Sequence, residues 1–144
     1  MTTLSYLHLR PGQPPPPLGD GRPFGAVLVI EDAVNHEWRA LVSDWLVASG
    51  CLYMVAWGRG CRSWDDSVDY ANLSHFDHGE IPADAFVMRT WHTEESLTET
   101  FWFAGQWASH RTVDLGRTII IHVSPEEREA DLLEAFQMAQ REDR

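Results

Sequence analysis

The side chains most able to carry chemistry are concentrated in residues 57–69. These positions hold two Trp, two Gly, one Cys, two Arg and three Asp. Trp and Arg side chains that meet at a surface are typical of the centre of a binding interface. We therefore predict that this stretch, with one Trp further along the chain, binds a ligand or a partner. The candidate binding residues are Trp57, Arg59, Arg62, Trp64, Asp65, Asp66 and Trp91.

Two histidines and one cysteine are candidates for catalysis. His92 and His122 lie at the ends of apolar runs, and an imidazole can transfer protons near neutral pH. Cys61 precedes a predicted helix, whose N-terminal dipole can lower the pKa of a nearby thiol. A cysteine that is merely buried or carried on a loop is the competing interpretation for Cys61. Cys51, which opens an apolar run, is interpreted as a core residue.

Acidic residues could instead hold a metal ion. Glu31 and Asp32 end an apolar run and are the first candidates, because divalent metals prefer carboxylate oxygens. Further ligands could come from Asp65, Asp66, His92, Glu95 and His122. No pair has a diagnostic short spacing such as H-E-x-x-H, so solvated acids at helix starts are the alternative. Gly58 and Gly60 precede a helix as in a phosphate-binding loop, but a third Gly is missing and two Asp follow, which favours a tight turn.

An alternation of apolar runs and amphipathic segments positions these residues. The runs are 24–30, 51–57, 85–91 and 117–123. Continuous apolar runs of this length are typical of strands that are covered on both faces. Periodic apolar positions after each run predict helices, and the expected caps of the last three are Ser63, Thr93 and Ser124.

The expected fold is a three-layer α/β/α sandwich, Rossmann-like or flavodoxin-like, with a four-stranded, mainly parallel sheet in the order 2-1-3-4. Residues 23–144 would form this single α/β domain. Residues 1–22 would form an extended, Pro-rich lead-in, because consecutive prolines favour polyproline II. Ligands of such sheets bind at the carboxyl ends of the strands, where acids, histidines and Trp are concentrated here. We therefore expect the site at that edge.

Charge and cysteine content exclude several classes of function. The formal net charge is −11 and every basic residue is Arg, which argues against binding to a nucleic-acid backbone or an anionic membrane. Without Lys there is no Schiff-base lysine and no P-loop lysine. The sequence shows no apolar stretch of membrane-spanning length and no signal-peptide pattern, and it has two Cys. A cytoplasmic protein is therefore expected.

The segment 27–32, with the residues that follow it as far as Cys51, resembles the start of a response-regulator receiver domain. In that family an acid pair after the first strand helps to hold Mg²⁺, and Glu31 and Asp32 match this pair. Residues 90–92 (Thr-Trp-His) stand where a receiver carries its phosphorylated Asp, and the late Lys of receivers is missing. The resemblance therefore implies no phosphotransfer.

Two later blocks resemble a bacterial family of unknown function. The first contains Trp57-Gly58, Cys61 and Trp64-Asp65-Asp66-Ser67-Val68-Asp69, and the second contains Met88-Arg89-Thr90-Trp91-His92 and Trp102-Phe103. This resemblance implies a bacterial cytosolic protein but no activity.

We expect a small binding or protein-interaction module, with a protein partner or a second copy of the chain docking at the carboxyl edge of the sheet. The alternative is a small hydrolase or metal-dependent enzyme that uses His, Asp or Cys side chains at the same edge. A divalent metal is the cofactor that such an enzyme would take.

Overall fold

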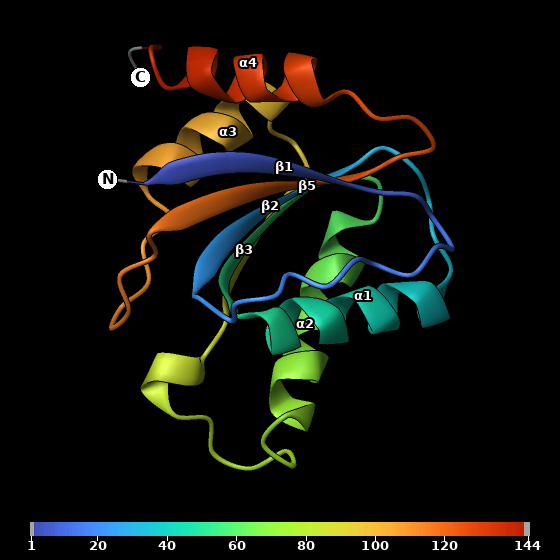
Figure 1. Cartoon of the computed structure of the whole chain (residues 1–144), viewed down its shortest axis with the longest axis vertical. Coiled ribbons are helices and arrows are strands. Elements are labelled where there is room, and N and C mark those ends of the chain that lie inside the picture. Colours follow the sequence, from blue (N-terminus) through green and yellow to red (C-terminus); the bar gives the residue numbers. More distant parts are fainter. Residues whose placement is uncertain (1, 143–144) are drawn as a thin grey trace.

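The computed structural model describes residues 2–142 and contains a parallel sheet between two pairs of helices (Figure 1). The strands are β1 (Thr3–Leu9), β2 (Phe24–Ile30), β3 (Cys51–Gly58), β4 (Met88–His92) and β5 (Arg117–Val123). The helices are α1 (His36–Ser49), α2 (Cys61–Ser74), α3 (Leu97–Gln106) and α4 (Glu129–Ala139), with a 3₁₀ turn η1 (Ala83–Ala85) before β4. The helices α1 and α2 cover one face, and α3 and α4 cover the other (Figure 1). The expected α/β fold with a parallel sheet is confirmed.

The number and order of the strands differ from the prediction. The sheet has five strands in the order β1-β5-β2-β3-β4, so the expected four-stranded order 2-1-3-4 is wrong. The last strand, β5, lies between β1 and β2 rather than at an edge, and its residues 119–123 are all buried. The five-residue strand β4 lies at the edge, and His92 is its one buried residue. A short strand of this kind suits an edge position.

The N-terminal residues 3–9 form β1, which pairs with β5 along its whole length. The Pro-rich segment that follows is attached to α1 by two indole groups. The Nε1 of Trp38 donates a hydrogen bond to the carbonyl of Gln13, and the Nε1 of Trp45 donates one to the carbonyl of Pro16, both at 2.8 Å. These bonds hold the extended segment against the α1 layer.

The core lies on both faces of the sheet. Successive strand residues point to opposite faces, and in β2 both sets are buried. Ala26, Leu28 and Ile30 pack toward α1 and α2, whereas Val27 and Val29 pack toward α3 and α4. This two-sided burial explains the continuous apolar run. The helices that complete the layers are short, and within residues 2–142 none is long and apolar enough to cross a membrane.

Three helices begin away from their expected caps. The helix α2 begins directly after Gly60, so Ser63 lies inside it. Ser96 rather than Thr93 caps α3, in a capping box. The helix α4 begins several residues after Ser124, whose hydroxyl instead bonds to the backbone of Glu126. Each shift is short in sequence, but it changes which side chains face the core.

Candidate functional site

The carboxyl ends of the strands bring both candidate histidines to one face of the sheet. Strand register places five residues in a row across the sheet, in the order His8, His122, Val29, Trp57, His92. Val29 and Trp57 belong to the cluster that packs toward α3 and α4. His122 and His92 therefore lie on the same face, on either side of these two residues.

His122 is fully buried, and both of its ring nitrogens are hydrogen-bonded. Its Nδ1 lies 2.6 Å from the hydroxyl of Tyr6, and its Nε2 bonds to Oε1 of Glu31. The same Oε1 accepts a hydrogen bond from Nη2 of Arg128 at 2.7 Å, and the Tyr6 oxygen accepts one from the Arg128 amide at 3.0 Å. All four groups are satisfied when Tyr6 donates to Nδ1 and Nε2–H donates to Glu31. This Tyr6–His122–Glu31–Arg128 chain links β1, β5, β2 and the start of α4.

The electrostatics favour a neutral imidazole beside an ionised carboxylate. Burial lowers the pKa of His122 and outweighs the opposing effect of Glu31. Burial alone would raise the pKa of Glu31, but hydrogen bonds from Arg128 and His122 outweigh it and the pKa is lowered. Burial raises the pKa of the Tyr6 hydroxyl. The contact between His122 and Glu31 is therefore a hydrogen bond from a neutral ring, and the ion pair of the network is that between Glu31 and Arg128.

This network should make the protein less stable in mild acid. Below the ordinary His pKa of 6.5, His122 is protonated in the unfolded chain but stays neutral in the folded chain, because folding lowers its pKa. The unfolded chain therefore binds more protons, and the stability of the fold falls as the pH falls. Urea unfolding at pH 7.5 and 5.5 should show this loss. The variant His122→Gln, which keeps a donor for Glu31 but cannot titrate, should show a smaller loss.

The matched control is His36→Gln, which replaces an exposed histidine of α1. It should keep the pH dependence of the wild type. An equal fall in stability for His122→Gln and the wild type would contradict the assignment of a depressed pKa to His122.

A second imidazole–carboxylate pair lies at the end of β4. The Nδ1 of His92 is 2.6 Å from Oε2 of Glu95, and its Nε2 is 3.0 Å from the hydroxyl of Thr90. The Nε1 of Trp57 donates to the Glu95 carbonyl at 2.8 Å, so the turn after β4 is fixed to the end of β3. His92 is buried against the ring of Phe103, whereas the Glu95 side chain is 45% exposed.

Glu31 of the first pair and both residues of the second pair line a cleft of about 410 Å³. We call it the carboxyl-edge cleft. Its lining residues are Ile30, Glu31, Trp57, Gly58, Arg59, His92, Thr93 and Glu95. Each of its two glutamates has one oxygen held by a buried histidine. No residue of the described range 2–142 donates a hydrogen bond to the other oxygen, Oε2 of Glu31 or Oε1 of Glu95. The cleft therefore presents two oriented carboxylates beside an indole ring.

The predicted binding residues fall into separate places. Trp57 and Arg59 line the carboxyl-edge cleft. Trp91 precedes His92 on the strand and so points to the other face, where the guanidinium of Arg62 lies 5.9 Å from its ring centre. Trp91 is 45% exposed. Asp66 lines a groove between α1 and α2.

Three of the predicted site residues are in the core. Trp64 is 1% exposed and packs edge-on against Trp38, with ring centres 6.2 Å apart. Asp65 is buried, with Oδ1 3.6 Å from Nε of Arg89, and burial raises its pKa. Cys61 is also buried in the layer between the sheet and α1 and α2. The structure therefore does not bring Cys61 to either histidine pair.

The acid pair predicted to bind metal gives only one residue to the cleft. Glu31 lines it and is engaged by Arg128 and His122, whereas Asp32 is not among the lining residues. Across residues 2–142, the structure contains no group of three or more His, Cys, Asp or Glu side chains arranged to hold a metal ion.

Tyr6 and Arg128 belong to the His122 network but were not predicted. The sequence of residues 4–9 allows either a short added strand or a surface segment, and the structure contains the strand. Nothing in the sequence indicates that this strand lies beside β5, which is what brings Tyr6 to His122. Arg128 reaches the network because α4 begins later than its apparent start signal suggests.

Comparison with known proteins gives a family but no activity. Neither a curated protein nor a solved structure matches the chain. A family model does match, over residues 4–139, which include every strand end that forms the carboxyl-edge cleft and the whole Tyr6–His122–Glu31–Arg128 chain. The protein belongs to the family described as Domain of unknown function (DUF7684).

Proposed function

We propose that the protein is a small binding domain that takes an organic cation, through an ammonium or guanidinium group, in the carboxyl-edge cleft. The observation that carries the proposal is the pair of carboxylates, Glu31 and Glu95, that face one cleft beside the Trp57 indole. Each has an oxygen left without a donor from the described residues. Such oxygens accept strong, charge-assisted hydrogen bonds.

The surroundings of the two carboxylates support a cation rather than an anion. Bonds from buried histidines hold both carboxylates in place before a ligand arrives, which reduces the entropy lost on binding. The ring of Trp57 is fixed by its bond to Glu95 and offers a face for a cation–π contact. Arg128 offsets part of the charge of Glu31 and Arg59 also lines the cleft, so Glu95 is the stronger anchor. The net charge of −11 also favours the approach of cations.

The proposal retains the wider expectations from the sequence. We propose a bacterial cytosolic protein, and two free cysteines, Cys51 and Cys61, agree with a reducing compartment. A protein partner or a second copy would dock at the same edge of the sheet, where Trp91 and Arg62 form an exposed pair on the face opposite to His92. The acidic charge supports a function that involves no nucleic acid.

Binding of agmatine, which carries both an ammonium and a guanidinium group, tests the proposal. Isothermal titration calorimetry should show saturable binding to the wild type. The variant Glu95→Gln removes the anchoring charge and should weaken binding by roughly tenfold or more, the usual effect of losing a hydrogen bond to a charged group. Glu94→Gln is the matched control, because the adjacent Glu94 does not line the cleft and its loss should leave the affinity nearly unchanged. If agmatine does not bind, or binds both variants equally, the proposal fails.

Acid–base hydrolysis at the same cleft is the second candidate, and the 2.6 Å pair of His92 and Glu95 favours it. A carboxylate that holds an imidazole is the usual arrangement around a general base. Turnover of p-nitrophenyl acetate that disappears in His92→Asn would support this reaction over simple binding. The absence of turnover in the wild type would reject it. The buried thiol of Cys61 has no role in this alternative.

A further inference from the structure

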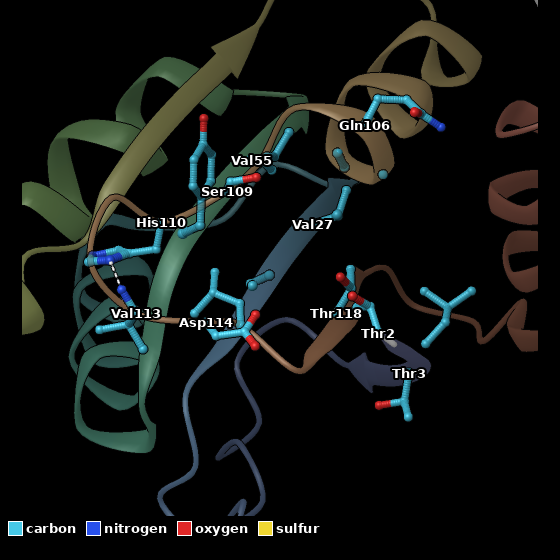
Figure 2. A pocket seen from close by; sticks show the side chains of 18 of the residues that line it. Thr2, Thr3, Val27, Val55, Gln106, Ser109, His110, Val113, Asp114 and Thr118 are labelled. Carbon is cyan, nitrogen blue, oxygen red and sulfur yellow. Dashed lines mark hydrogen bonds between the residues drawn. The ribbon is translucent and has the colours of Figure 1, made fainter.

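A second cavity, of about 570 Å³, lies at the opposite edge of the sheet, at the amino ends of the strands. We call it the amino-edge cavity. Its floor contains Gly25 and Val27 of β2 and Tyr53 and Val55 of β3. The end of α3 and the loop 107–116 form one wall, and residues of β1 and β5 form another. In Figure 2, Val27 lies between Thr118 of the second wall and Ser109 of the first.

Many of the side chains around the floor are uncharged hydrogen-bonding groups. They include the hydroxyls and amides of Thr2, Thr3, Gln106, Ser109, Thr112, Thr118 and Gln140. Of the lining side chains that carry a full charge at neutral pH, Arg111 is basic and Asp114 is acidic, so the two offset each other. The loop itself is fixed by His110, whose Nδ1 accepts a hydrogen bond from the amide of Val113 (Figure 2). The cavity therefore favours neither an anion nor a cation.

Gly25 leaves the floor open near the start of β2, where the pairing of β2 with β3 shifts register between Phe24 and Gly25. Its φ is not positive, and a Cβ placed on it would meet its nearest atoms, of Leu115 and Tyr53, at 3.8 Å, an ordinary contact. Glycine inside a strand costs stability and often marks a place where a ligand approaches the backbone closely. A register shift of this kind suits glycine, and the missing side chain leaves space above the strand that a ligand can enter.

Tyr53 contributes a free hydrogen-bonding group to the cavity. The residue is 6% exposed, and its hydroxyl makes no hydrogen bond with any residue of the described range. That oxygen is not one of the fully buried polar atoms that lack a partner among the described residues, so it is open to the cavity. Burial of the residue raises the pKa of the phenol. The hydroxyl is therefore available to bond with a molecule that enters the cavity.

We propose that the amino-edge cavity is a second binding site, which takes an uncharged, hydroxylated ring and hydrogen-bonds it through Tyr53. A sugar ring has an apolar C–H face that suits the open floor over Gly25. It also has a rim of hydroxyls that suits the surrounding Thr and Ser side chains. A free monosaccharide and the ribose of a nucleoside share this chemistry. The volume lies within the usual range for small-molecule sites.

The test is a titration of the full-length, ¹⁵N-labelled protein with D-glucose, adenosine and AMP, followed by amide chemical shifts. Glucose or adenosine should shift the amides of the loop 107–116 in a saturable way, and whichever binds identifies the source of the ring. The site is overturned if neither does so. The uncharged class is overturned if AMP binds more tightly than adenosine.

Two variants separate binding from folding. Tyr53→Phe should weaken binding about five- to tenfold, the range expected for one hydrogen bond, and should not lower stability, because the hydroxyl has no partner to lose. Tyr70→Phe, at a tyrosine that is 65% exposed and far from the lining, should leave the affinity unchanged. Equal affinity in Tyr53→Phe and the wild type would overturn the role of Tyr53.

Gly25→Val fills the floor with a residue that strands favour. It should abolish binding of the sugar ring while the protein stays folded by circular dichroism. Agmatine binding at the carboxyl-edge cleft should be unchanged, so this site and the proposed function can fail separately. Undiminished binding of glucose or adenosine by Gly25→Val would place the ligand elsewhere and overturn the proposal.

Discussion

Gly58→Ala is expected to destabilise the protein by about 3 kcal/mol, from the combined cost of a strained backbone and of overpacking. Gly58 ends β3 with a φ of +107°, a conformation that L-residues rarely adopt. A Cβ at this position would lie well inside the contact distance of the Ile30 carbonyl oxygen. That oxygen accepts the Arg59 amide at 2.9 Å, so β2 and β3 would have to separate at their carboxyl ends.

The same substitution should impair the carboxyl-edge cleft, because Gly58 and Ile30 both line it and Glu31 follows Ile30 directly. Agmatine binding should therefore be lost together with stability, as measured by urea unfolding and calorimetry.

Gly60→Ala is a sharp control for this prediction. Gly60 also has a positive φ, of +66°, but a Cβ there would meet nothing within 4 Å. Its cost should be limited to the left-handed backbone, about 1–2 kcal/mol. If the two variants lose equal stability, the close approach of β2 and β3 is not what requires glycine at position 58.

Trp64→Ala should cost about 3–5 kcal/mol, the usual result of removing a large aromatic side chain from a core. The indole of Trp64 is among the largest fully buried side chains, and it packs edge-on against Trp38 of α1. Guanidinium unfolding followed by circular dichroism measures the loss without relying on Trp fluorescence. Trp64→Phe should recover part of the stability, because an aromatic ring is retained.

The comparison is Trp91→Ala, which truncates a Trp that is 45% exposed at the end of the edge strand. Its effect on stability should be about 1 kcal/mol or less, in keeping with substitutions near the surface. The reverse order, with Trp91→Ala the more damaging, would show that Trp64 is not a core residue.

The interpretation of Trp64 shows how a shift of a few residues changes the predicted site. Ser63 and the acids after it suggested a helix start, which would leave Trp64 near the surface. The helix instead begins at Cys61, and its buried residues include Cys61, Trp64, Val68 and Ala71. That spacing of three and four is an ordinary helical stripe. The apolar periodicity was present in the sequence, but the polar cap signal outweighed it.

The order of the strands could not be predicted because it depends on contacts that no local pattern records. Every internal strand is an apolar run, so each one suits a position inside the sheet. The arginine and threonine of β4, and its short length, are the weak signs of its edge position. The isoleucines at 119–121 are the corresponding sign that β5 is an internal strand.

The candidate site was also predicted only in part, because some of its contacts are local in sequence and others are not. The position of His92 and His122 at strand ends follows from the apolar runs alone, and a parallel sheet brings such ends to one edge. Glu95 lies three residues after His92, so their contact is local. The partners of His122 are distant in sequence, since Tyr6 comes from the other end of the chain. Local pattern cannot find such contacts.

The pairing of β1 with β5 has a consequence for how the chain folds. The first strand has no partner until the last one is in place, so completing the sheet requires the closure of nearly the whole chain, which slows folding. After β5 has paired with β2 and before β1 has paired with β5, the isoleucine-rich β5 presents an unpaired edge. Such edges attract strands from other molecules. Competition between β1 and neighbouring chains for β5 should therefore make the yield of refolding fall as protein concentration rises.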